Sequence, residues 1–440
     1  MNPAQPLAGV RVLDLCVVFS GTAATMLLGD LGAEVIKVES RNVYSVATKG
    51  PRRLSARSVD RLDNLTRGYA GREPGDRPWD RWAPYAVHGR NKRSMTVDLT
   101  RPDGRAVFLD LLARSDALLE NNKAGLLEKL GLGWDVLHAR NPGLVLVRMP
   151  PLALDGEAAT LGGLGSNFEA MTGALAFRGY RDLPPATRPV SYRMDAATGP
   201  MAAFATVAAL RDARRTGNGR LVVLPQAVTL MHHFADQLVA AQRGGPRVTR
   251  PGNRHPRMAP HGCYPVHADG HAEAWIVIAC RDDGDWQACA RVLGAPPGLE
   301  RFATLAARKS DEDALDETVT DLTRAVDGPT LEQHLVAAGV PAALVRTEAM
   351  KLADPQLRAR GFFHRIEHPV VGERTFPGHL WRTSAGPLRF ERAAPTLGQD
   401  NDYVYREVLG YDDERIGSLT AAGHIGERYT FEDPLPEDSP

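Results

Sequence analysis

One aspartate of this chain stands where a carboxylate can do chemistry. Asp195 opens the sequence DAATG, which precedes a long helical pattern. The partial positive charge of a helix N-terminus favours the ionised carboxylate and fixes its direction, as a nucleophile requires. Most aspartates at such positions only cap the helix, so the residue taken alone favours a cap over a catalytic group.

A second candidate is the turn at Ser20 and Gly21. It follows an apolar strand expected over residues 10–15 and opens a helix that ends near Gly32, after which residues 35–38 predict another buried strand. In such a β-α-β unit the turn lies at the carboxyl edge of the sheet, where open α/β sheets bind ligands. We therefore expect a nucleotide-type ligand near this turn.

The glycine motifs of the common nucleotide-binding folds are absent. After Gly21 the next glycines are Gly29 and Gly32, so no Gly-x-Gly-x-x-Gly follows the first strand, and no Gly-Lys-Ser/Thr phosphate loop occurs. The sequence therefore lacks the main motifs that would indicate a nicotinamide dehydrogenase or a P-loop enzyme. From this unit alone, a purely structural turn is the favoured interpretation.

Length, charge and cysteine content narrow the class of protein. A chain of 440 residues is too long for one typical core, so we expect two domains. Its 53 basic and 53 acidic residues cancel, which points to neither nucleic acid nor a membrane surface as a partner. Because no secretory leader or membrane-length apolar run is present, we expect a cytoplasmic protein. No metal-ligand spacing or disulfide framework joins the four cysteines, Cys16, Cys263, Cys280 and Cys289.

Strand and helix patterns alternate over about the first 225 residues, which predicts an α/β fold with a mostly parallel sheet. Residues 41–90 interrupt this pattern with a polar, arginine-rich stretch. We interpret it as a solvated excursion, with a positive rim for phosphates as the alternative. Residues 226–344 predict a smaller α+β domain, and residues 426–440 a loosely ordered acidic tail.

Segments spread over nearly the whole chain resemble class III CoA-transferases, the family of formyl-CoA transferase, carnitine CoA-transferase and α-methylacyl-CoA racemase. The set is specific because the segments follow the family's order. They are LAGVRVLDL with DLGAEVIKVE, NKRSMTVDL with RPDGRAV, LLEN with LEKLGLGWDVLHARNPGLVLV, EAMTG, the aspartate motif with RRTGNGR, RPGNRHPRMAPHGCYP, and ADPQLRARGFF with PTLGQDN.

The resemblance implies a Rossmann-like CoA-binding large domain over residues 1–225, completed by about residues 345–425. It also implies an interlocked homodimer with the active site between subunits. The CoA thioester is expected as a substrate, with no tightly bound cofactor, ATP or metal. The other substrate is expected to be a carboxylic acid acceptor.

Asp195 matches the family's nucleophilic aspartate. The resemblance implies that it attacks the acyl-CoA carbonyl to give a mixed aspartyl anhydride, which the CoA thiolate converts to an aspartyl-CoA thioester. The acceptor carboxylate then takes up the CoA through a second anhydride. By position, the residues that match CoA-lining residues of the family are Val18, Phe19, Ser40, Val97, Thr100, Asn121, Asn122, Lys123 and Lys129.

Several positions depart from the family's pattern. Thr22 replaces a usual proline, and MPPL at residues 149–152 replaces a Ser-Gly-Phe-Gly-like stretch. Leu164 and Gly165 stand where many relatives carry Tyr-Asp or His-Asp. Glu169 then either supplies a polar side chain to the site or lies on a helix surface.

The alternatives differ in the groups that they need. A racemase needs two acid/base groups on opposite faces of the α-carbon, and Leu164 occupies the position where racemase relatives use histidine. An isomerase that moves CoA within one molecule would keep Asp195. A third interpretation is a catalytically silent paralogue that only binds acyl-CoA. The sequence also leaves two roles open for Arg254, Arg257, His255 and His261, which either bind a substrate carboxylate or belong to a loop.

Overall fold

The computed structural model describes residues 5–56, 66–183, 193–244, 250–268, 270, 273–294, 296–388 and 390–430. The chain divides into two compact units. The first comprises Met1–Ala174, Val190–Val239 and Ala359–Pro440, and the second comprises Leu175–Pro189 and Ala240–Arg358. These limits are not the domain boundaries expected near residues 225 and 345, which stay predictions.

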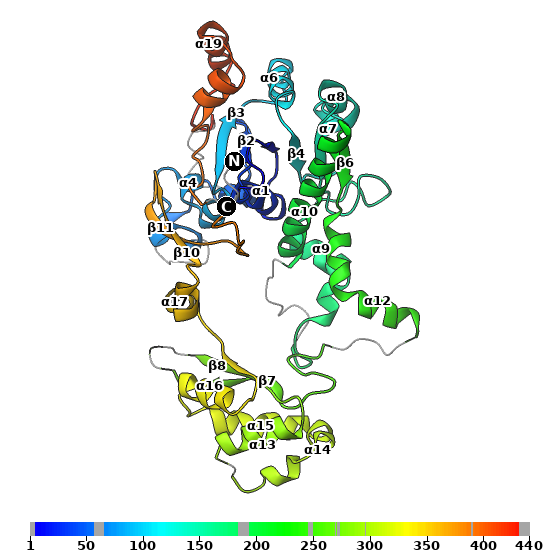
Figure 1. The fold of residues 1–440 in the computed structure, drawn as a ribbon, viewed down its shortest axis with the longest axis vertical. Helices are drawn as coiled ribbons and strands as arrows, with labels where there is room; N and C mark the ends of the chain where they lie inside the picture. Colours follow the sequence, from blue (N-terminus) through cyan, green and yellow to red (C-terminus); the bar gives the residue numbers. More distant parts are fainter. Residues whose placement is uncertain are drawn as a thin grey trace. The chain divides into compact units, whose positions relative to one another are not determined.

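A six-stranded parallel sheet organises the first unit (Figure 1). Its strands are β1 (Arg11–Asp14), β2 (Glu34–Glu39), β3 (Lys92–Thr96), β4 (Ala117–Glu120), β5 (Val145–Arg148) and β6 (Arg220–Val223). They pair in the order β3-β2-β1-β4-β5-β6, with every neighbouring pair parallel. The predicted α/β fold with a mostly parallel sheet is confirmed. Because the order reverses beside β1, the turn after β1 lies at the switch point of the sheet.

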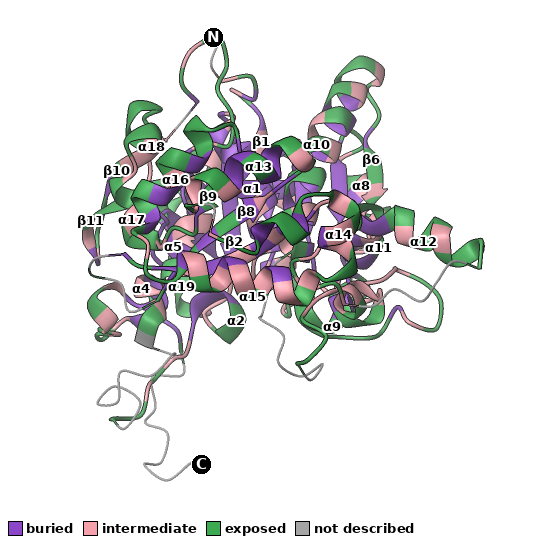
Figure 2. Cartoon of the chain, turned by 90° about the horizontal axis from the view of Figure 1, so that it is seen from below, coloured by how far each residue is buried: buried purple, intermediate pink, exposed green. Residues whose placement is uncertain are grey.

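Helices cover both faces of this sheet, which explains why its inner strands are apolar and buried (purple in Figure 2). On one face, α1 (Ser20–Asp30) and α10 (Arg193–Thr216) share a core cluster with β1, β2 and β5. On the other face, α6 (Pro102–Leu112) and α8 (Trp134–Arg140) pack with η6 (Tyr403–Val408) and α19 (Asp413–Ala421). The C-terminal part of the chain thus completes the core of the first unit.

Shorter elements surround the sheet in the first unit. They are α2 (Val46–Lys49), η1 (Thr66–Gly68), η2 (Ala70–Arg72), α4 (Pro78–Arg81), α5 (Ala83–His88), α7 (Leu126–Lys129), α9 (Gly165–Met171), α11 (Gln226–Met231), η4 (His232–Phe234), β10 (Phe363–His368) and β11 (Gly372–Pro377). Three further elements, η3 (Ala174–Phe177), α12 (Ala235–Gln242) and α18 (Pro355–Ala359), cross the limits of this unit.

The stretch interpreted as a solvated excursion is packed in part into the first unit. Residues 57–65 lie outside the described residues. Among the others, Lys49, Trp79, Asp80 and Tyr85 are buried, so the interpretation is wrong for these positions. Aromatic side chains supply the apolar surface that a solvated segment lacks.

The second unit contains a three-stranded antiparallel sheet in the order β7-β8-β9. Its elements are β7 (His261–Val266), β8 (Ala274–Ala279), α13 (Asp283–Val292), η5 (Leu299–Phe302), α14 (Leu305–Ser310), α15 (Glu312–Thr323), α16 (Gly328–Ala337), β9 (Ala342–Leu344) and α17 (Glu348–Ala353). Alternate strand residues and the helices form one buried cluster. Residues 431–440 of the predicted loose tail lie outside the described residues, whereas Tyr429 is buried against Trp79.

Candidate active site

A hollow of about 580 Å³ opens in the first unit at the carboxyl edge of the sheet. The turn after β1 and the segment after β4 form part of its wall, and the starts of α9, α10 and α11 form another part. The segment after β2 closes it with residues of α2 and with Trp82. The lining residues are 17–20, 46–47, 51, 82, 121–123, 151, 162–166, 168, 194–195 and 226.

Asp195 lines this hollow from the first turn of α10. The helix already includes Arg193 and Met194, so Asp195 lies within it and the predicted capping position is wrong. Burial is the main cause that raises the pKa of Asp195 to about 6, and the nearby Glu169 raises it further. The backbone N–H of Ser20 donates to the carboxylate and opposes this rise. The group is thus ionised at neutral pH yet poorly solvated, which suits a nucleophile.

Two glycines explain how Asp195 reaches this place. A Cβ atom at Gly199 would lie 3.0 Å from both the Cβ of Ala23 and the carbonyl oxygen of Ser20. The absence of that atom lets α10 approach the first turn of α1. A Cβ atom at Gly165 would lie 3.2 Å from Oδ2 of Asp195, so the start of α9 passes directly against the carboxylate.

Buried side chains hold the turn that faces Asp195. The Ser20 hydroxyl donates to Oε1 of Gln226 at 2.7 Å, and Nε2 of Gln226 donates to the carbonyl oxygen of Met149 at 2.8 Å. The Asn121 amide pairs with both the N–H and the carbonyl of Val17, each at 2.8 Å. The ends of β1, β4 and β5 are therefore tied together beneath the hollow.

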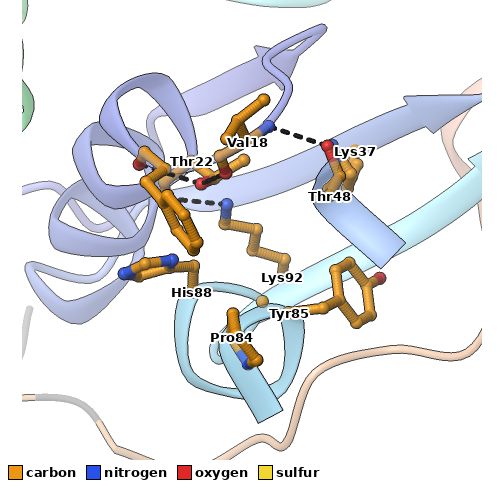
Figure 3. Close-up of a pocket in the computed structure, with 10 residues that line it drawn as sticks. Val18, Thr22, Lys37, Thr48, Pro84, Tyr85, His88 and Lys92 are labelled. Atoms are coloured by element: carbon orange, nitrogen blue, oxygen red, sulfur yellow. Dashed lines mark hydrogen bonds between the residues drawn. The ribbon is translucent and has the colours of Figure 1, made fainter. Parts of the chain in front are cut away.

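Two buried lysines help to line a small cavity beside this turn (Figure 3). Lys92 Nζ donates to Asp14 at 2.9 Å and to the Thr22 carbonyl at 3.0 Å, while Lys37 Nζ donates to the Cys16 carbonyl at 2.8 Å. Burial opposes ionisation of Asp14, but the two lysines outweigh it and lower the pKa of Asp14 to about 2. This ionic support was not predicted from the sequence, although charged residues inside otherwise apolar strands are its signal.

The structure brings together six of the predicted site residues. Asp195, Val18, Phe19, Asn121, Asn122 and Lys123 line one hollow. The other four do not line it. Val97 is buried in the core, and the Thr100 hydroxyl donates to Asp98 at 2.6 Å. Ser40 accepts from the N–H of Asn42 after β2, and Lys129 is exposed on α7. The roles of these ten residues stay predictions.

The departures from the family's pattern also cluster here. Leu164 lines the hollow with 56% of its surface exposed, and Pro151 contributes from the altered 149–152 stretch. Glu169 is buried and accepts a hydrogen bond from the N–H of Met194 at 3.3 Å. The helix-surface alternative for Glu169 is therefore wrong. Thr22 donates to the Phe19 carbonyl at 3.0 Å and so supports the turn.

In the second unit, Arg254 pairs with Asp313 and Asp316, and His255 Nδ1 accepts from the N–H of Arg257 at 3.1 Å. These contacts support the loop interpretation for Arg254 and His255. Within the described ranges, no group of His, Cys, Asp and Glu residues is arranged to hold a metal ion. None of the helices described has the length and apolar character that crossing a bilayer requires.

Comparison with known proteins identifies the class. The family model for CoA-transferase family III matches residues 7–401, so the chain belongs to this family and is an enzyme of this class. Succinyl-CoA–D-citramalate CoA-transferase of Chloroflexus aurantiacus is 33% identical over 96% of this chain and 98% of its own. Human succinyl-CoA:glutarate CoA-transferase is 27% identical over 98% of this chain and 92% of its own. The crystal structure of a CAIB/BAIF family protein from Brucella suis covers 92% of this chain and 100% of its own, with a TM-score of 0.77 and 29% identity.

Proposed function

We propose that this enzyme transfers CoA from an acyl-CoA thioester to a free carboxylic acid, with Asp195 as the covalent nucleophile. The observation that carries the proposal is the position of Asp195. It is the one carboxylate among the described residues that line the hollow, and a backbone N–H points at it from the β1–α1 turn. The family membership supports the transfer of CoA, and the site supplies the group that would carry it.

The reaction exchanges activated acyl groups. The Asp195 carboxylate attacks the thioester carbonyl, the C–S bond breaks, and an aspartyl anhydride and CoA thiolate result. The thiolate attacks the Asp195 carbonyl and releases the donor acid as a carboxylate. The acceptor carboxylate then displaces the thiolate from Asp195, and the thiolate attacks the acceptor carbonyl of the new anhydride. Asp195 is regenerated as a carboxylate, and no net proton, electron or phosphate is consumed.

The chain's own residues prepare Asp195 for this role. Partial burial removes water from the carboxylate and makes it a better nucleophile, while the Ser20 N–H fixes its orientation. Gly165 leaves room beside Oδ2, which the attacked carbonyl needs. The Ser20–Gln226 and Asn121–Val17 hydrogen bonds keep the turn rigid.

We propose that CoA lies along the carboxyl edge of the sheet. Val18, Phe19 and Asn121 to Lys123 would contact its thioester end, where they share the hollow with Asp195. Ser40, Val97, Thr100 and Lys129 would act farther from the reacting carbonyl, since they follow β2 or β3 or lie on α7. The strand order of the sheet supports a Rossmann-like CoA-binding domain.

The alternatives fit the site less well. Racemisation needs a second proton-transfer group, and Leu164, which lines the same hollow as Asp195, cannot transfer a proton. A catalytically silent paralogue, which would only bind acyl-CoA, does not require a poorly solvated carboxylate in an open hollow. An isomerase would share the intermediates above and would differ only in its acceptor.

We also propose that the enzyme is a homodimer, with the interlocked topology that its family resemblance implies. Large apolar side chains are exposed on α10, α11 and β6, including Met201 (45%), Phe204 (69%) and Val228 (47%). A second copy would remove this surface from water. Light scattering is expected to give twice the 47.7 kDa chain mass. A folded monomer at dilution would contradict the assembly.

Trapping tests the nucleophile. The enzyme is incubated with a donor acyl-CoA and hydroxylamine, and the Asp195 peptide is examined by mass spectrometry. The anhydride and thioester both react with hydroxylamine, so a hydroxamate at Asp195 and loss of activity are expected. Asp195→Asn is the matched control, because it preserves shape but not nucleophilicity. Normal turnover by that variant would refute the proposal.

A further inference from the structure

The turn between β1 and α1 contains a strained residue. Val18 has a backbone φ of 58°, which lies in the left-handed region. A side chain branched at Cβ is rarely found there, because it crowds the backbone, whereas glycine adopts this conformation freely. Such a conformation persists only where neighbouring groups hold it, and it is common at functional sites. The contacts that hold Val18 therefore bear on how the turn serves the site.

Two threonine hydroxyls hold the backbone of Val18 (Figure 3). The N–H of Val18 donates to Oγ1 of Thr48 at 2.7 Å, and the Thr22 hydroxyl donates to the Val18 carbonyl. Thr22 belongs to α1, the helix that follows the turn, whereas Thr48 belongs to α2 and lies 30 residues further along the chain. Thr48 thus ties Val18 to a separate segment of the first unit.

The position of Thr48 is itself fixed by buried contacts. Thr48 is buried, and its hydroxyl lies 2.9 Å from that of Ser45. The next residue, Lys49, places its Nζ 3.0 Å from Oε1 of Glu39 at the end of β2 and 3.4 Å from the centre of the Tyr85 ring. Because a buried ion pair is costly to separate, this contact anchors α2 to the sheet. The hydroxyl that meets the turn is therefore held from the end of β2.

The conformation of Val18 determines how the chain enters α1. This helix begins at Ser20, and the N–H groups of a first helical turn have no partner within their own helix. One of them, the N–H of Ser20, donates to the Asp195 carboxylate and lowers its pKa against the effect of burial. A relaxed Val18 would redirect the chain two residues before Ser20 and draw this N–H away from Asp195.

We propose that Thr48 is a positioning residue of the active site, which accepts the Val18 N–H and so holds the strained turn that aims the Ser20 N–H at Asp195. Thr48 lines the small cavity of Figure 3 and not the hollow that contains Asp195, so it acts through the turn and not on the reacting atoms. The proposal deepens the proposed function, because it rests on Asp195 as the nucleophile.

Removal of the Thr48 hydroxyl tests this role. Thr48→Val keeps the shape of the side chain but cannot accept the Val18 N–H, whereas Thr48→Ser keeps the hydroxyl. The assay is kcat/KM for CoA transfer between pH 4.5 and 8. In Thr48→Val the plateau of kcat/KM is expected to fall about tenfold or more, because Asp195 and its N–H donor are no longer aligned. Thr48→Ser is expected to stay close to the wild type.

The pH profile separates positioning from a general loss of packing. Without the Ser20 N–H, the pKa of Asp195 rises, so the pH at which kcat/KM is half its plateau is expected to be higher in Thr48→Val than in the wild type. The charged groups nearby are the same in every variant, since Glu169 raises this pKa from α9 and Lys123 lines the hollow from the segment after β4.

Thr323→Val is the matched control. Thr323 is also buried, and its hydroxyl donates to the Thr320 carbonyl within α15 of the second unit. Its pH profile is expected to match that of the wild type. An unchanged half-plateau pH in Thr48→Val would overturn the proposal. An equal loss of kcat/KM in Thr48→Ser would also overturn it, because the lost methyl group and not the hydroxyl would then be responsible.

Relief of the strain gives a second test. Glycine adopts the left-handed conformation without strain, so the turn of a Val18→Gly variant depends less on Thr48. Thr48→Val is expected to lower kcat/KM by a factor about fivefold smaller in the Val18→Gly background than in the wild-type background. Equal factors in the two backgrounds would overturn the proposal. The comparison cancels any effect that Val18→Gly alone has on CoA binding.

Hydrogen exchange separates this proposal from the proposed function, because it needs no turnover. Exchange of the Val18 amide is measured by mass spectrometry, and it is expected to be about tenfold or more faster in Thr48→Val than in the wild type. Fast exchange in the wild type would overturn the positioning role, even if Thr48→Val does not fold, and would leave a hydroxylamine adduct on Asp195 standing. Slow exchange in the wild type with no adduct on Asp195 would support the held turn and refute the nucleophile.

Discussion

Glu169 offers a way to change the ionisation of Asp195 without touching it. Glu169 is buried, and its charge is one of the causes that raise the pKa of Asp195. Glu169→Gln removes this charge, yet the amide oxygen can still accept the hydrogen bond from the N–H of Met194. The pKa of Asp195 is expected to fall in the variant but to stay above its usual value, because burial, the larger cause, persists.

The pH dependence of the wild-type enzyme follows from that pKa. Only the ionised carboxylate attacks, so kcat/KM is expected to rise with pH through about 6. The Asp195 carboxyl is ionised in about a tenth of the enzyme molecules one pH unit below its pKa and in about nine tenths one pH unit above it. The value of kcat/KM at pH 5 is therefore expected to be about a tenth of its plateau value. Glu169→Gln is expected to retain a larger fraction at pH 5.

The assay is kcat/KM for CoA transfer between pH 4.5 and 8, which reports the ionisation of the free enzyme. Glu157→Gln is the control, because it removes an exposed carboxylate that does not line the hollow. Two results would refute the reasoning. One is a wild-type kcat/KM that falls with decreasing pH only near the usual aspartate pKa. The other is a fall in kcat/KM that begins at a higher pH in Glu169→Gln than in the wild type.

Three further predictions concern the same residues. Because burial raises the folded-state pKa of Asp195 from 3.8 to about 6, its ionised form destabilises the fold as pH rises through this window. In denaturant titrations at pH 7.5, Asp195→Asn should therefore have a free energy of unfolding about 1 to 3 kcal/mol higher than that of the wild type, and it should show no such gain below pH 4. Equal gains at the two pH values would contradict this. Gly165→Ala should lower kcat by crowding Oδ2, whereas Gly162→Ala, which has nothing within 4 Å, should not; equal effects would refute the steric argument. Gln226→Ala should lower the free energy of unfolding by about 1 to 3 kcal/mol, because the Met149 carbonyl loses this hydrogen bond and the Ser20 hydroxyl keeps only the one that it accepts from Nδ2 of Asn121 at 3.3 Å; unchanged denaturation would show that the Met149 carbonyl finds another partner.

Local pattern was enough to predict the parallel sheet and the position of the β1–α1 turn at its carboxyl edge. The apolar strands and the helix between Ser20 and Gly32 are set by residues close in sequence, so the β-α-β unit could be inferred directly. The family's motifs then singled out Asp195, which the residue alone favoured only as a cap. Its inclusion within α10 could not be inferred, because helix boundaries depend on tertiary packing such as the close approach of α10 to α1 at Gly199, where an added Cβ would meet Ala23.

The remainder of the site depends on contacts between distant segments. The stretch after β2 was interpreted as solvated, because its many arginines outweigh a few aromatic residues in a sequence pattern. Trp82 nevertheless reaches the hollow once Gly50 and Gly68 give it space. Burial of Glu169 depends on how α9 meets α10, which no spacing within α9 reveals. Tertiary contacts decide both cases.

Isotope transfer tests the central claim most directly. The enzyme is given a donor acyl-CoA and an acceptor acid labelled with ¹⁸O in its carboxylate, in unlabelled water, and the Asp195 peptide is weighed after a single turnover. If the acceptor forms an anhydride with Asp195, cleavage at the acceptor carbonyl leaves one labelled oxygen on the aspartate, and the peptide gains the mass of one ¹⁸O. Transfer of CoA with no label on Asp195 would contradict the proposed role of this carboxylate.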